Sequence, residues 1–177
     1  MNSLVALSLS IGILGGVATF LAVGPLSGFF LIWAATISWA AFFAFGASKD
    51  ALKNTLVCGT FGVAMAWLAA LEITTIPADA PFALMAAIAV AASVIVMCLA
   101  AKIPALATIP ASVLGYSATF AYLLQTPEQL TQAQLLSCSL SNPLLLIPIS
   151  LAVGSLFGLA SVKLSAKLES CVKCNKK

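Results

Sequence analysis

Hydrophobic residues fill the chain in long runs, and charged residues interrupt these runs at only a few places. The first charged side chain is Lys49, so residues 1–48 are long enough for two membrane-spanning helices of about 20 residues each. Gly24 and Pro25 divide this stretch, because proline ends a preceding helix and is tolerated in the first turn of the next. The whole pattern predicts an all-α, polytopic membrane bundle with six spans, over residues 4–23, 26–46, 54–71, 82–102, 104–124 and 143–162.

The charged residues between these spans test the count. In a six-span chain every second loop lies on the same side of the membrane as both termini. The loops and tail on that side hold all eight lysines, and the loops on the other side hold only acidic residues, Glu72, Asp79 and Glu128. An excess of lysine marks the cytoplasmic side. We therefore expect both termini in the cytoplasm and the protein in the inner (plasma) membrane of a bacterium.

Composition excludes most other classes of protein. Of the 177 residues, 62% are hydrophobic and only 7% are charged, whereas a soluble domain carries roughly 25% charged residues. The chain has no histidine and no arginine, so the usual general base, zinc ligand and phosphate clamp are missing. We expect no enzyme activity, no cofactor, no metal site and no nucleic-acid partner. The lipid bilayer is the expected partner.

The sequence predicts one domain and a tail. Residues 1–162 form the six-helix transmembrane domain, and residues 163–177 form a basic, disordered cytoplasmic tail. Cys171 and Cys174 are a lone C-x-x-C pair in that tail; two pairs could share a zinc ion in a dimer, but reduced, free thiols are the simpler interpretation. The first span could be a cleaved signal peptide, but its flank lacks a basic residue, so we expect a retained helix. Residues 127–136 could form a short surface helix capped by Thr126.

An internal repeat is a further hypothesis. Residues 38–45 of the second span align with residues 115–122 of the fifth, with aromatic residues opposite each other at three positions. A repeat of three helices would be inverted in the membrane, as in many transporters and channels. The alternative is chance similarity in a chain rich in Ala, Phe and Gly. Small residues also recur every four positions, which favours close helix packing within the bundle or an oligomer interface. They are Gly12 and Gly16, Gly24 and Gly28, and Ser150, Gly154 and Gly158.

The predicted spans contain no ionisable side chain near mid-membrane, which disfavours an ion-coupled pump. Passive passage of a small neutral solute needs only hydroxyls, carbonyls and aromatic walls. Trp39 and Tyr116 lie deep in their spans and match each other in the repeat. The candidate pore-lining residues are Trp39, Thr108, Ser112, Tyr116, Ser117 and Thr119.

Prolines within the last two predicted spans are a second indication of a polar site. A proline inside a helix frees the carbonyl four residues earlier, and lipid tolerates this only where protein or water satisfies the group. Pro110 would free the carbonyl of Leu106, and Pro148 that of Leu144. A simple kink is the alternative interpretation.

Several segments carry a resemblance to a known family. Residues 8–16, 38–42, 97–102 and 115–121, taken in order, resemble the YcdZ-like small bacterial inner-membrane proteins. That family has no established function, so the resemblance implies a location and a pattern of spans but no substrate. Pro25-Leu26-Ser27-Gly28 and Thr108-Ile109-Pro110 are similar to segments of urea transporters, of which this chain would form about half. Gly24 stands where those transporters have Asn, and their polar gating residues have no counterpart.

Two functional hypotheses follow. The first is a channel or facilitator for a small uncharged solute, working as a homo-oligomer. The second is a non-transporting membrane scaffold or accessory subunit, which predicts a dry, tightly packed bundle without a continuous cavity.

Overall fold

The computed structural model describes residues 2–174, with side chains over residues 2–171, and this part of the chain is helical without any strand. Six long helices follow the six predicted spans in order, and a short helix, α6, precedes the last one. The helices are α1 (Ser3–Val23), α2 (Ile32–Ala44), α3 (Lys49–Thr74), α4 (Phe82–Leu99), α5 (Ile109–Gln125), α6 (Gln132–Leu135) and α7 (Pro143–Cys174).

Four stretches are long and apolar enough to cross a membrane: Ser3–Val23, Lys49–Thr74, Phe82–Lys102 and Pro143–Cys171. They indicate a membrane protein. α2 is also apolar but has only 13 residues, and α5 has 17. At 1.5 Å per residue, α2 extends about 20 Å, which is shorter than the ~30 Å of hydrocarbon that a full span crosses.

Local signals set most helix ends. Ser48 caps α3, since its hydroxyl accepts a hydrogen bond from the Ala51 amide at 3.1 Å. Asn142 does the same for α7 through the Leu144 amide at 2.9 Å. Gly46, with a φ of +97°, follows the end of α2, where the left-handed conformation favours glycine. Thr131 caps α6, so this surface helix begins at Gln132, later than the predicted Pro127. The helix is four residues long.

Several predicted boundaries differ from the structure; α3, for example, begins at Lys49, five residues before the predicted position 54. Residues 24–31 form turns, and α2 starts six residues after the predicted position 26, because Gly28 adopts a φ of +86° that no helix can contain. α5 begins at Ile109, and two 3₁₀ helices, η1 (Ala100–Lys102) and η2 (Pro104–Leu106), precede it. α7 continues to Cys174, well past the predicted position 162, because no Gly or Pro interrupts residues 159–174. The helix therefore includes most of the predicted disordered tail; residues 175–177 lie outside the described part.

The prolines take different roles from those expected. Pro110 lies in the first turn of α5, where the missing amide costs nothing, so it does not interrupt a helix as the sequence suggested. Pro104 begins η2 in the same way. Pro148 is inside α7, as predicted.

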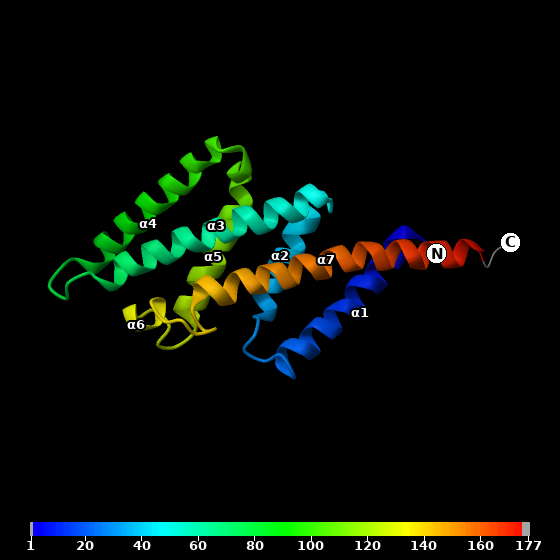
Figure 1. Cartoon of the computed structure of the whole chain (residues 1–177), viewed down its shortest axis with the longest axis horizontal. Helices are drawn as coiled ribbons and strands as arrows, with labels where there is room; N and C mark the ends of the chain where they lie inside the picture. The colour runs from blue at the N-terminus through cyan, green and yellow to red at the C-terminus, as the bar shows by residue number, and fades with distance from the viewer. Residues whose placement is uncertain (1, 175–177) are drawn as a thin grey trace.

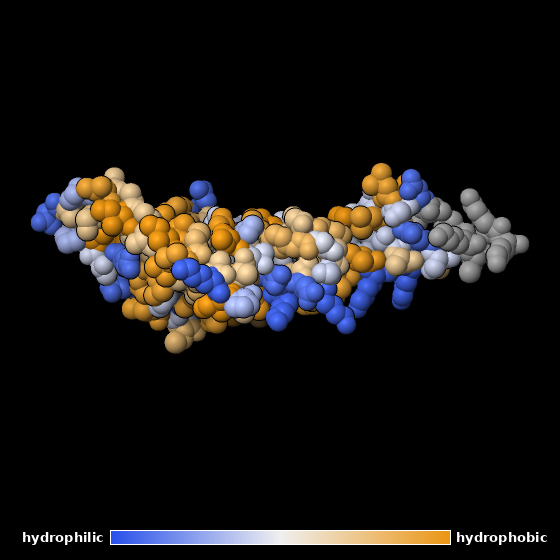
Figure 2. Space-filling model, turned by 90° about the horizontal axis from the view of Figure 1, so that it is seen from above, coloured by the Kyte–Doolittle hydropathy of each residue, from blue (hydrophilic) through white to orange (hydrophobic). Residues whose placement is uncertain are grey.

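The helices form an elongated bundle with α3 and α7 packed side by side along its length (Figure 1). α5 packs mainly on α3, and α2 packs mainly on α7. α1 lies against α7 at one flank, and α4 lies against α3 at the opposite flank (Figure 1). Each flanking helix touches its own neighbour in sequence, α2 or α5, only slightly. Hydrophobic residues cover much of the outer surface (Figure 2), as expected where lipid is the solvent.

Candidate functional site

The six predicted pore-lining residues do not meet around one cavity. Ser112 and Thr119 are buried in the helix packing, and the Thr119 hydroxyl donates to the carbonyl of Gly115 in its own helix at 2.9 Å. Thr108 is half-buried just before α5. Tyr116 and Ser117 line a crevice between α4 and α5, whereas Trp39 lines a separate crevice between α1 and α2. Their shared role in a pore stays a prediction.

A line of hydroxyl groups instead marks the contact between α2 and α7. We call Ser38, Ser150, Ser155 and Ser161 the serine seam; all four are almost fully buried. Ser38 donates to the carbonyl of Leu151 at 2.6 Å, so the hydroxyl of Ser155, 2.6 Å from that of Ser38, is the donor of their pair. The three α7 members lie along about 16 Å of that helix.

The ends of the serine seam hold α2 in place. The amide of Leu31, the residue before α2, donates to the Ser150 hydroxyl at 2.9 Å, and Ser150 donates to the carbonyl of Leu146. At the other end Trp39 Nε1 donates to the Ser161 hydroxyl at 3.2 Å. The Ser161 hydroxyl itself donates a hydrogen bond to the carbonyl of Gly158 at 2.7 Å. Each seam hydroxyl thus has a partner within the protein.

Glycines allow the closest approaches between helices. A Cβ atom at Gly62 on α3 would overlap the carbonyl of Ser112 on α5, and one at Gly115 on α5 would overlap the carbonyl of Gly59 on α3. On the other side, a Cβ at Gly154 on α7 would overlap the carbonyl of Ala35 on α2. Small residues therefore let the backbones of these helix pairs touch, as in other membrane bundles.

The two crevices that hold Tyr116 and Trp39 lie beside this core. The α4–α5 crevice has a volume of about 520 Å³ and the α1–α2 crevice about 330 Å³, and apolar groups form most of both walls. The hydroxyl of Tyr116 at the α4–α5 crevice lies 2.8 Å from that of Ser93, which already donates to the carbonyl of Val90, so Tyr116 is the donor. Among the described residues no group of three His, Cys, Asp or Glu could hold a metal ion.

Sequence reasoning missed the contribution of α7. Ser155 and Ser161 were not among the candidates, and Ser150 was noted only for its size. The sequence held a signal for two of them, because Ser150 and Ser161 lie about 20° apart around an ideal helix at 100° per residue, whereas Ser155 lies about 120° or more from both. The sequence could not show which helix faces them.

Comparison with known proteins places the chain in a family without assigning it a role. The family described as "Protein of unknown function (DUF1097)" matches residues 8–166. The chain belongs to this family. No curated protein and no solved structure matches the chain. The apolar helices and the family together indicate a membrane protein of unknown function.

Proposed function

We propose that the chain is a passive facilitator for a small uncharged solute in the bacterial inner membrane, and that the serine seam marks its route. The carrying observation is the line of buried hydroxyls along α7; each is bonded within the protein, and a passing solute would take the place of those partners without meeting a buried charge. Hydroxyls and carbonyls are sufficient for neutral permeants. The similarity of residues 25–28 and 108–110 to urea transporters favours the same class of solute, and the YcdZ-like resemblance favours the location.

An inverted repeat of α1–α3 and α4–α7 is part of this proposal. Matching contacts on the two sides support it. The close contact of Ala35 with Gly154 corresponds to that of Ser112 with Gly62. Ser112 lies 112 − 35 = 77 positions after Ala35, and Gly154 lies 154 − 62 = 92 positions after Gly62. Ser38 meets Leu151 as Gly115 meets Gly59, with the same differences of 115 − 38 = 77 and 151 − 59 = 92.

The crevices follow the same relation. Tyr116, Ser117 and Phe120 line one crevice, and the residues 77 positions earlier line the other. Those residues are Trp39, Ala40 and Phe43. A pseudo-twofold axis in the membrane plane would direct the two crevices toward opposite faces, which is the arrangement of alternating or passive transport pathways.

A non-transporting scaffold is the second candidate. One observation favours it: among the described residues, no buried side-chain nitrogen or oxygen lacks a hydrogen-bond partner. Hydroxyls that are paired in this way can hold helices together in lipid without binding any solute. The two candidates differ in whether the seam hydroxyls exchange partners with a solute.

Solute flux into liposomes separates the two candidates. The full chain is reconstituted, and stopped-flow light scattering measures the entry of urea, glycerol and acetamide; ammonia entry is followed with a pH-sensitive dye. A facilitator gives flux above that of empty vesicles, and Ser155→Ala lowers it severalfold because one seam hydroxyl is lost. Ser8→Ala is the matched control, since Ser8 is exposed and bonds only within α1. Flux equal to that of empty vesicles for every solute rejects the facilitator and leaves the scaffold.

A further inference from the structure

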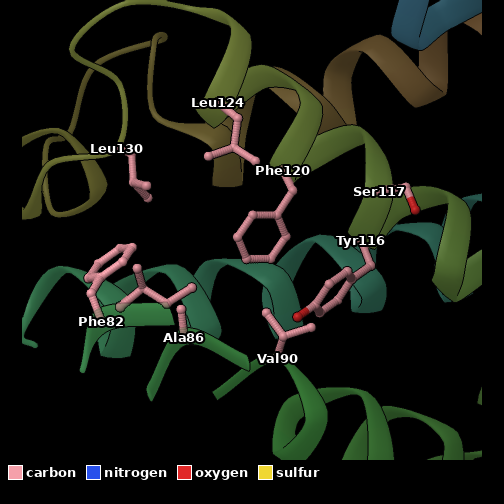
Figure 3. A pocket seen from close by; sticks show the side chains of 9 residues that line it. Phe82, Ala86, Val90, Tyr116, Ser117, Phe120, Leu124 and Leu130 are labelled. Atoms are coloured by element: carbon pink, nitrogen blue, oxygen red, sulfur yellow. The ribbon is translucent and has the colours of Figure 1, made fainter. Parts of the chain in front are cut away.

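The α4–α5 crevice has the walls of a binding site for an apolar chain. Its sides come from two helices that touch only slightly, so the space between them stays open. The side chains that line it are mostly apolar, and its polar groups are the hydroxyls of Tyr116 and Ser117 (Figure 3). Its volume of about 520 Å³ lies within the usual range of ligand pockets. The α4 and α5 side chains that line it are Phe82, Ala86, Val90, Tyr116, Ser117, Phe120 and Leu124.

The crevice has a closed end and an open end. At the deep end the hydrogen bond between Tyr116 and Ser93 joins α5 to α4 and satisfies both hydroxyls. The hydroxyls of Tyr116 and Ser93 are therefore already paired when a ligand reaches that end. At the other end Phe82, in the first turn of α4, is 57% exposed.

A polar mouth continues from the open end. A second hollow of about 450 Å³ shares Ile73, Phe82 and Leu130 with the crevice, so the two are contiguous. Its wall is distinctly more polar, because it adds Thr74 and Thr131 as well as Gln132. Apolar walls leading to a polar mouth match an amphiphile with one hydrocarbon chain and a hydrogen-bonding head.

The charged residues near the polar mouth indicate which kind of lipid head group it attracts. Glu128, two residues before Leu130 in the wall of the mouth, is an exposed carboxylate, and Glu72, also exposed, lines a neighbouring hollow that shares Ile76 with the mouth. The nearest lysine on α3 is Lys53, 21 residues before Thr74, or about 32 Å away along the helix. That distance exceeds the Debye length of about 8 Å at physiological salt, so no described lysine on α3 offsets these carboxylates. An ammonium group is attracted to the mouth and an anionic head is not.

We propose that the α4–α5 crevice binds one acyl chain of a bilayer phospholipid whose zwitterionic head carries a free ammonium, seated at the Thr74–Thr131 mouth. The lipid completes the bundle wall that α4 leaves open. The α1–α2 crevice is also apolar, with Trp39 and Phe43 in its wall, and it serves as the internal comparison. This inference goes beyond the proposed function, because lipid occupancy requires no solute flux.

Photo-crosslinking in liposomes tests the proposal on the unaltered full chain. Two probes carry the same diazirine acyl chain, one on phosphatidylethanolamine and one on phosphatidylglycerol, and mass spectrometry locates the labelled residues. We expect Phe82, Ala86 and Phe120 to be labelled about fivefold more by the ethanolamine lipid, the preference of a single charge at a membrane surface. Equal labelling by both probes overturns the proposal. So does labelling confined to the outward side chains of α4, such as Leu84 and Ile88.

Filling the crevice provides a second readout. Ala86→Phe places a ring in the crevice and should reduce labelling of Phe120 to the level of the outward α4 side chains. Ala40→Phe fills the α1–α2 crevice instead and should leave that labelling unchanged. The labelling pattern of the unaltered chain tests the proposal by itself. A failure of Ala86→Phe to fold would therefore leave that test unaffected. Solute flux measured on the same liposomes reports separately on the facilitator.

Discussion

Single glycines determine how closely α3 and α5 approach. Gly115→Ala would push a methyl group into the carbonyl of Gly59, and neither backbone can move without separating the two helices. Overpacking of this kind costs about 1–3 kcal/mol. We expect Gly115→Ala to lower the free energy of unfolding by at least that range, measured by titration with sodium dodecyl sulfate in mixed micelles.

Gly12 on α1 is the matched control for this change. A Cβ atom there meets nothing within 4 Å, so Gly12→Ala should leave the unfolding free energy unchanged or raise it slightly. Equal destabilisation by both substitutions would mean that the α3–α5 contact is looser than described.

The hydrogen bond between Trp39 and Ser161 is a second test at the scale of single residues. Such bonds between membrane helices contribute ~0.6 kcal/mol on average and up to ~1.7 kcal/mol. A double-mutant cycle of Trp39→Phe and Ser161→Ala should give a coupling energy in that range. Trp33→Phe with Ser161→Ala is the control cycle and should give none; a zero coupling for Trp39 would contradict the bond.

At the scale of helices, the sequence predicted which helices form better than it predicted where they end or which helices pack together. Long apolar runs, divided by charged residues and in one case by Gly24 and Pro25, were sufficient to locate six helices in order. The start of α2 could not be predicted, because Gly28 is compatible with helix until its φ of +86° is known. The packing partner of each helix could not be predicted either. A helix that is apolar on all sides has no distinct apolar face to indicate where a neighbouring helix packs. Ser112 and Thr119 could therefore be listed as pore candidates although they lie within the packing.

The exchange of partners between the two halves has a consequence for folding. α2 packs mainly on α7 and α5 mainly on α3, so each half of the chain supplies surface that the other half needs. We expect fragments 1–77 and 78–177, cut in the exposed loop at Pro77, to co-purify through a tag on one fragment when expressed together. Either fragment alone should aggregate.

Substitutions in the fragments make this prediction specific. Gly154→Leu in the second fragment would overlap the carbonyl of Ala35 and should abolish co-purification. Gly16→Leu in the first fragment meets open space and should not. Fragments that fold separately, each without the other, would contradict the exchanged packing.

At the scale of the whole molecule, the distribution of charge predicts one orientation. The lysines with described side chains lie at the start of α3, after α4 and in the last part of α7, whereas Glu72, Asp79 and Glu128 lie near the other ends of these helices or in the adjoining loops. The beginning of α1 and the end of α7 lie toward the same end of the bundle (Figure 1). This separation is what the positive-inside rule expects of a chain with cytoplasmic termini.

Two native cysteines can test that orientation without insertion of a tag. Cys138 lies in the loop after α6 and Cys171 lies near the end of α7, and both are exposed. In intact bacteria that express variants with a single cysteine, a membrane-impermeant maleimide should label Cys138 at once and Cys171 only after permeabilisation. Cys58 is buried and should react only after denaturation, which shows that labelling requires an exposed thiol. Labelling of Cys171 but not Cys138 would invert the orientation, and it would turn the acidic mouth of the α4–α5 crevice toward the cytoplasmic leaflet. The bound lipid would then have to be drawn from that leaflet.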